Sequence, residues 1–143
     1  MQPLPLDTES FHLIRTAKEP MLYVDKTAYL HRLITDPQAH CFFLARPRRF
    51  GKSLMISTLE EIFLGHRDLF KGLAIDTLEY DWDAYPVIHL NMAKCSSASR
   101  ETFLRMLPVE MEQAIVSAGG TYDQGLLPAS NFGRALDTFA AQV

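Results

Sequence analysis

The sequence predicts an α/β fold in which helices flank a parallel sheet, and three observations support this prediction. Residues 42–45 form a short apolar run without alternation, which is typical of a strand buried on both faces of such a sheet. The run leads through a basic turn into a segment from Lys52 that has apolar residues at helical spacing until Gly65. Residues 86–91 form a second predicted strand whose first residue is proline, a position that strands tolerate. These segments predict one right-handed β-α-β crossover, with residues 21–24 as a candidate third strand.

Capping residues and a proline place the remaining elements, which are all expected to be helical. Ser10 is a candidate N-cap for a short helix, and Asp25 is one for a second helix with an apolar face. A long helix starts near residue 100, and Pro108 either kinks it or divides it in two. Ser130 is positioned to cap a last helix that extends to about residue 139.

The basic turn carries a partial phosphate-loop pattern. Gly51, Lys52 and Ser53 complete the motif G-x-x-x-x-G-K-S/T, but Arg46 stands where the first glycine belongs. Backbone N–H groups and the helix dipole favour a phosphate at the start of the following helix. Lys52 is expected to be the catalytic cation that reaches the β and γ phosphates, and the Ser53 hydroxyl is expected to ligate Mg²⁺. The sequence thus predicts a site for ATP and Mg²⁺. The residues predicted to bind the nucleotide are Arg46, Pro47, Arg48, Arg49, Phe50, Gly51, Lys52, Ser53 and Leu54.

Several strings of the sequence resemble the AAA-ATPase-like family of prokaryotic proteins. The most specific is RPRRFGKSLMISTLEEIF, with YVDKTAYL before it and LFKGLAI and YPVIHLNM after it. In that family an arginine in place of the first loop glycine is usual, and the family's nucleotide loop falls on residues 46–53. Members typically join an N-terminal P-loop ATPase domain to a C-terminal domain that resembles PD-(D/E)xK nucleases. The resemblance therefore implies a downstream nuclease-like domain as a partner within the full-length protein.

The same resemblance implies that the chain is the N-terminal portion of one P-loop NTPase domain of the RecA/AAA-like type. Its expected parts are a helical lead-in at residues 1–40, a P-loop β-α-β unit at 41–92 and a helical segment at 93–143. The alternative for the basic turn is a purely structural role.

Asp25 and Lys26 lie in the upstream string YVDKTAYL, which the resemblance places near the nucleotide. Helix capping and solvation also explain these two residues.

P-loop ATPases need an acidic residue after a further apolar strand, and the sequence offers no good candidate. Residues 73–76 end in Asp76 but form a short run that precedes the second predicted strand. In the resembled family the acidic strand lies just after residue 143, so we expect a domain truncated before its Walker B strand. Hydrolysis by this chain alone is not expected. Two alternatives remain open, a nucleotide-dependent interaction module that does not hydrolyse ATP and a P-loop kinase.

Composition limits the classes of partner. With 143 residues, of which 48% are hydrophobic, the chain can bury a globular core. A net charge of −3 argues against a generally basic surface, so direct binding of nucleic acid is not expected. No segment resembles a membrane span or a signal peptide, which makes the cytoplasm the default location.

Other candidate site residues have structural explanations. Cys41 and Cys95 lack metal-ligand spacing and are expected to be free, buried thiols. The five histidines show no paired spacing that would indicate a zinc site. Tyr80, Trp82 and Tyr85 could stack on adenine, but packing is the more usual role for aromatic residues in this position.

Overall fold

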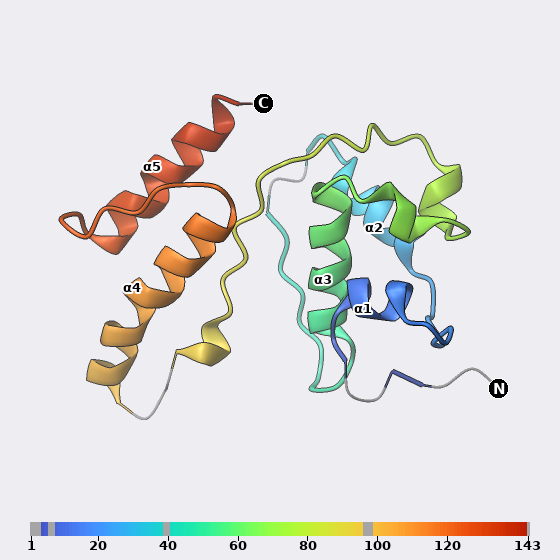
Figure 1. Ribbon diagram of the computed structural model, residues 1–143, viewed down its shortest axis with the longest axis horizontal. Coiled ribbons are helices and arrows are strands. Elements are labelled where there is room, and N and C mark those ends of the chain that lie inside the picture. Colours follow the sequence, from blue (N-terminus) through green and yellow to red (C-terminus); the bar gives the residue numbers. More distant parts are fainter. Residues whose placement is uncertain (1–3, 6–7, 39–40, 96–98, 143) are drawn as a thin grey trace. The chain divides into compact units, whose positions relative to one another are not determined.

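The computed structural model describes residues 4–5, 8–38, 41–95 and 99–142, and these residues form helices and irregular segments only (Figure 1). No strand occurs among them, so the predicted α/β fold with a parallel sheet is wrong. The chain divides into two compact units, Met1–Ala84 and Tyr85–Val143. None of the described helices is both long and apolar enough to cross a membrane.

Each unit has its own set of helices. The first unit contains α1 (Phe11–Thr16), α2 (Thr27–Ile34), α3 (Lys52–Phe63) and the 3₁₀ helices η1 (Arg67–Phe70) and η2 (Ala74–Thr77). The second unit contains the 3₁₀ helix η3 (Met92–Lys94) and the helices α4 (Arg100–Ser117) and α5 (Pro128–Ala140).

Residues 42–45, predicted as a buried strand, form an exposed irregular segment that leads toward α3 (Figure 1). Phe43 is 94% exposed, and Phe42 and Leu44 are also exposed. A strand needs a neighbour to pair with its backbone N–H and C=O groups, and no described segment forms such a ladder with these residues. The apolar run therefore does not indicate a sheet.

The other two predicted strands are irregular as well. Residues 21–24 and 86–91 contain no strand, although much of the second segment is half-buried. Ile88 packs against the core of the second unit. The Asn91 side chain caps η3, while its backbone N–H donates to Glu110 Oε1 at 2.9 Å. The apolar pattern of this segment thus indicates burial against helices.

Helix α3 begins and ends where the sequence predicts. It starts at Lys52, and Gly65 ends it in the left-handed conformation with φ +72°. The Gly65 N–H donates to the Ile62 carbonyl at 3.0 Å, and the His66 N–H donates to the Glu61 carbonyl at 3.1 Å. These two bonds form a Schellman motif, which satisfies carbonyl groups at the end of the helix.

Helix α1 also begins where predicted, because the Ser10 side chain accepts a hydrogen bond from the Leu13 N–H at 3.3 Å. The helix is fixed to α3 by its first residue, whose N–H donates to Ser57 Oγ at 3.0 Å. That residue, Phe11, is fully buried and stacks on Phe70 with ring centroids 4.7 Å apart.

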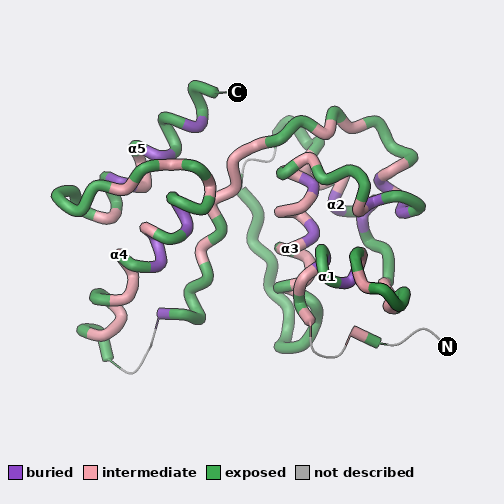
Figure 2. The backbone as a smooth tube through the Cα atoms, viewed as in Figure 1, coloured by how far each residue is buried: buried purple, intermediate pink, exposed green. Residues whose placement is uncertain are grey.

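The core of the first unit lies between α1, α2, α3 and the two 3₁₀ helices, where Figure 2 shows its buried residues. Its buried members are Phe11, Leu30, Ile62, Phe70, Leu73 and Ile75. Tyr80 and Trp82 pack against this core and meet edge to face, 5.4 Å apart. The predicted packing role of these two aromatic residues is therefore confirmed, and half-buried Tyr85 begins the second unit.

Asp25 links the start of α2 to η2. The N-cap residue of α2 is Lys26, so the predicted N-cap, Asp25, is one position too early. Asp25 Oδ1 accepts hydrogen bonds from the N–H and the hydroxyl of Thr27, and Oδ2 accepts one from the Ala74 N–H at 2.7 Å. Thr27 in turn is fully buried and accepts from the Ile75 N–H. Burial raises the pKa of the Asp25 carboxyl, but these hydrogen bonds outweigh it and leave the pKa below its ordinary value.

Replacing Asp25 with alanine should lower the free energy of unfolding by about 1–3 kcal/mol, because three hydrogen bonds to a carboxylate are lost. A carboxyl with a lowered folded pKa stabilises the fold above its unfolded pKa of about 3.9 and loses that effect as the pH falls through the folded value. Urea unfolding at pH 7 and in steps below pH 4 should therefore show the difference between variant and wild type shrinking. Asp36→Ala is the control, since among the described residues Asp36 accepts only the local N–H of Gln38. An equal loss in both variants would contradict the linking role of Asp25.

In the second unit, α4 is one continuous helix that contains Pro108, so the proline does not divide it. The Ser99 side chain caps its start by accepting from the Thr102 N–H at 3.1 Å. As predicted, the helix ends at Gly119 and Gly120, which form a second Schellman motif with the carbonyls of α4.

Helix α5 begins earlier than predicted. Pro128 occupies its first turn after Leu127, a favoured place for proline, so Ser130 lies inside the helix and does not cap it. The helix is fixed by Asn131, which is fully buried and exchanges hydrogen bonds with the backbone of Asp123. The core between α4 and α5 comprises Ile115, Ala135 and Phe139, against which Ile88, Ala118 and Tyr122 pack.

Candidate functional site

The basic turn predicted to bind phosphate forms a compact loop directly before α3. Arg49 and Gly51 both adopt the left-handed conformation, with φ values of +65° and +69°. Lys52 Nζ donates to the Arg46 carbonyl at 2.7 Å and to the Pro47 carbonyl at 2.8 Å. The ammonium of Lys52 therefore closes the loop on itself.

The start of α3 is open to an anion. No side chain caps the helix, and its first turn contains no acidic residue. The first N–H groups of a helix have no partner within the helix, and the helix dipole makes this end positive. Ser53, in the first turn, is exposed. The cationic side chains on the loop and at the helix start are those of Arg46, Arg48, Arg49 and Lys52.

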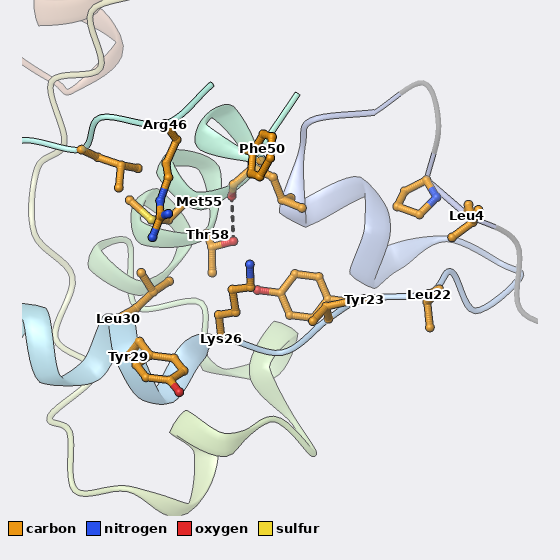
Figure 3. A pocket seen from close by; sticks show the side chains of 15 residues that line it. Leu4, Leu22, Tyr23, Lys26, Tyr29, Leu30, Arg46, Phe50, Met55 and Thr58 are labelled. Carbon is orange, nitrogen blue, oxygen red and sulfur yellow. Dashed lines mark hydrogen bonds between the residues drawn. The ribbon is translucent and has the colours of Figure 1, made fainter. Parts of the chain in front are cut away.

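Beside this loop lies a pocket of about 640 Å³, shown in Figure 3. It is bounded by the loop with the segment that leads into it, by α3, α2 and the irregular segment before α2, and by residues 4–5, all within the first unit. In Figure 3 the side chains of Arg46 and Lys26 point toward the middle of an otherwise largely apolar pocket. The lining residues are Leu4, Pro5, Leu22, Tyr23, Val24, Lys26, Tyr29, Leu30, Leu44, Arg46, Phe50, Gly51, Leu54, Met55 and Thr58.

Polar groups inside the pocket are few. The Thr58 hydroxyl donates to the Leu54 carbonyl at 2.8 Å within α3. Burial raises the pKa of the Tyr23 phenol, although a hydrogen bond with Thr58 works in the opposite direction. Tyr23 is therefore a neutral phenol around pH 7, able to donate a hydrogen bond. Such a pocket suits a flat apolar ring whose anionic tail lies toward Arg46 and Lys26.

The structure places the predicted nucleotide-binding residues in two groups. Arg46, Phe50, Gly51 and Leu54 line the pocket. The others lie on the loop or the first turn of α3 but do not line the pocket, namely Pro47, Arg48, Arg49, Lys52 and Ser53. Thus the one loop joins a cationic surface to an apolar pocket.

Sequence reasoning missed much of the pocket. Tyr23, Tyr29 and Leu30 look like ordinary core positions of a strand and a helix, and outside residues 46–54 Lys26 is the only residue of the pocket for which the sequence offers a functional interpretation. The three aromatic residues considered for adenine stacking, at positions 80, 82 and 85, do not line the pocket.

Both cysteines are free, as predicted. Burial is confirmed for Cys95, whereas Cys41 is exposed because the segment that contains it is not a buried strand.

Comparison with known proteins bears on this site. Residues 5–143 match the model of the AAA-ATPase-like family, which is described as a predicted AAA-ATPase. The chain belongs to this family. The resemblance carried by the RPRRFGKS string is therefore confirmed.

The chain is also 42% identical over 89 residues to a protein of Azotobacter chroococcum mcd 1 named "Uncharacterized protein in vnfD 5'region". The match covers 62% of this chain but only 16% of that relative, so the chain spans a small part of the relative's length. No solved structure matches the chain.

Proposed function

We propose that this chain binds ATP with Mg²⁺, with the triphosphate on residues 46–53 and the base in the adjoining pocket. The observation that carries the proposal is that Arg46, Phe50 and Gly51 belong both to the cationic loop and to the apolar pocket. A ligand with an apolar ring and a polyanionic tail fits this juxtaposition. The description of the family as a predicted AAA-ATPase supports the same class of ligand.

In this proposal Lys52 exchanges its loop contacts for phosphate. Its ammonium now donates to two backbone carbonyls, those of Arg46 and Pro47. Hydrogen bonds between an ammonium and a phosphate oxygen are charge-assisted and stronger than those to neutral carbonyls. Arg48 and Arg49, both exposed, add positive charge, and the exposed Ser53 hydroxyl is available as a ligand for Mg²⁺.

The base would occupy the pocket. Its volume of about 640 Å³ lies within the usual range for small-molecule sites of roughly 300–1,000 Å³. Tyr23, Tyr29 and Phe50 provide aromatic surface, and the Tyr23 hydroxyl provides a donor for a ring nitrogen. Binding of the base would thus depend on residues outside the phosphate loop.

Hydrolysis would require a carboxylate beside the metal. Neither the first turn of α3, where Ser53 would hold the metal, nor the lining of the pocket among the described residues contains an acidic residue. We therefore propose that this chain binds ATP without turning it over. We also propose that in the whole protein binding is coupled to further domains.

Titration calorimetry with Mg·ATP tests the phosphate half of the proposal. Lys52→Ala should weaken binding at least about tenfold, since a charge-assisted contact is worth roughly 1.5–3 kcal/mol. Lys71→Ala is the control, because Lys71 is an exposed cation of the same unit that pairs with Asp68 at 2.7 Å. No binding by the folded wild type, or equal binding by both variants, would rule out the loop as the site.

The pocket half has its own test. Tyr29→Ala should weaken binding of Mg·ATP but leave binding of inorganic triphosphate unchanged, because Tyr29 lines the pocket and lies outside the loop. Tyr122→Ala, which alters the second unit, is the control. If Tyr29→Ala weakened both ligands equally, the pocket would not be the site of the base.

A further inference from the structure

Two histidines and a glutamate meet at the far end of α3 from the loop. His12 lies on α1, Glu61 on α3, and His66 directly before η1. His12 Nδ1 is 3.5 Å from Glu61 Oε1, and His66 Nδ1 is 2.6 Å from Glu61 Oε2. One donor atom from each residue can be chosen so that all three lie within 4.8 Å of one another. We propose that these three residues bind a divalent transition-metal ion of the zinc type.

The scaffold holds the three side chains in place. His66 is fixed above Glu61 by the Schellman motif, in which its N–H donates to the Glu61 carbonyl at 3.1 Å. His12 is fixed by the neighbouring residue Phe11, which is fully buried and bonded to α3 through Ser57. On the same short helix, Arg15 Nε donates to the Leu69 carbonyl at 2.6 Å and so fastens α1 to η1. Ligands on elements that are already fastened together lose little freedom when an ion binds.

The donor set indicates the class of ion. Two imidazole nitrogens with one carboxylate oxygen suit Zn²⁺ and similar ions, whereas Mg²⁺ prefers oxygen donors. Tetrahedral zinc with bonds of about 2.0–2.1 Å separates its ligand atoms by about 3.4 Å. His12 Nδ1 and Glu61 Oε1 are already close to this separation, at 3.5 Å. His66 Nδ1 and Glu61 Oε2 are 2.6 Å apart, so an ion bound between them would move these two atoms apart by roughly 0.8 Å.

Exposure allows an ion to enter. The side chains of His12 and His66 are each 50% exposed, while that of Glu61 is only 12% exposed. A largely buried carboxylate between two accessible imidazoles provides one negative charge where the ion would bind. Three protein ligands also leave a fourth position for water.

This site is separate from the proposed nucleotide site. Glu61 follows Lys52 by nine residues on α3, which corresponds to about 13 Å along the helix. The ion would join α1 to the junction of α3 and η1. Since α1 has only six residues and cannot persist without packing, the expected consequence is stabilisation of the first unit.

The test is titration of the full chain with Zn²⁺ by calorimetry, with Co²⁺ absorption as a second readout of tetrahedral coordination. His12→Gln and His66→Gln each keep a polar side chain beside Glu61 but remove a metal ligand. Each should weaken Zn²⁺ binding at least about tenfold, since even the loss of an outer hydrogen bond to a ligand costs 10–100-fold. His89→Gln in the second unit is the matched control and should bind as the wild type does.

A thermal readout completes the experiment. Saturating Zn²⁺ should raise the Tm of the wild type by at least about 4 °C and leave that of the double variant His12→Gln, His66→Gln unchanged. A large excess of Mg²⁺ should not displace Zn²⁺. Absence of Zn²⁺ binding by the folded wild type, or equal affinity in the double variant, would overturn the proposal and leave these three residues as a hydrogen-bonded cluster.

Discussion

Replacing Phe11 with alanine is expected to lower the free energy of unfolding of the first unit by about 3–5 kcal/mol. Phe11 is fully buried and contacts two other rings, those of Phe70 at 4.7 Å and Tyr23 at 5.2 Å. Its removal would leave a cavity at the junction of α1, α3 and η1 and would also weaken the anchor of α1. Because domains are typically stable by only about 5–15 kcal/mol, the variant should be close to unfolding. Urea unfolding followed by circular dichroism measures the change.

Phe43→Ala provides the matched control for the same side-chain truncation. Phe43 is 94% exposed, so its replacement should change the free energy of unfolding by no more than about 0.5 kcal/mol. The pair of variants also tests the correction to the fold, because a buried strand at residues 42–45 would make Phe43→Ala costly. Comparable losses in the two variants would contradict the exposed position of Phe43.

The start of α1 and both ends of α3 could be predicted because they are marked by local chemistry. Ser10 and Gly65 act within a few residues of their own positions, so the sequence alone identifies them. The presence or absence of strands cannot be predicted in the same way, because a strand forms only when a distant segment pairs with it. Short apolar runs such as 42–45 and 86–91 fit a buried strand, a packed irregular segment or an exposed one equally well.

The candidate site likewise has one part that could be predicted from local sequence and one that could not. The loop around Lys52 has a motif with fixed spacing, so it could be found from sequence. The pocket residues Tyr23, Leu30 and Met55 come from separate segments, and an apolar residue that lines a pocket looks the same in sequence as one that fills a core. The cluster of His12 with Glu61 and His66 could not be predicted from sequence spacing, because His12 lies on a different helix, far from the other two residues in sequence. The turn after α3 places His66 beside Glu61, and the packing of α1 on α3 adds His12.

Gly65→Ala is the second substitution with a large expected effect, about 2–5 kcal/mol of destabilisation. At φ +72° a side chain is strained, which costs roughly 1–2 kcal/mol. In addition, a Cβ at this position would lie 2.7 Å from the carbonyl oxygen of Trp82, a backbone atom that cannot rotate away. Relief of this overlap requires the chain around Trp82 to shift, for which a further 1–3 kcal/mol is a rough expectation.

Gly72→Ala separates these two causes. Gly72 has a similar φ of +79°, but a Cβ there would meet no atom within 4 Å. This variant should therefore show the conformational strain alone, about 1–2 kcal/mol, and equal losses in the two variants would show that the Trp82 segment moves at no cost. Because Gly65 also sets the position of His66 through the Schellman motif, Gly65→Ala should weaken Zn²⁺ binding as well, whereas Gly72→Ala should not. The same turn that ends α3 would then determine both the stability of the first unit and the geometry of its proposed metal site.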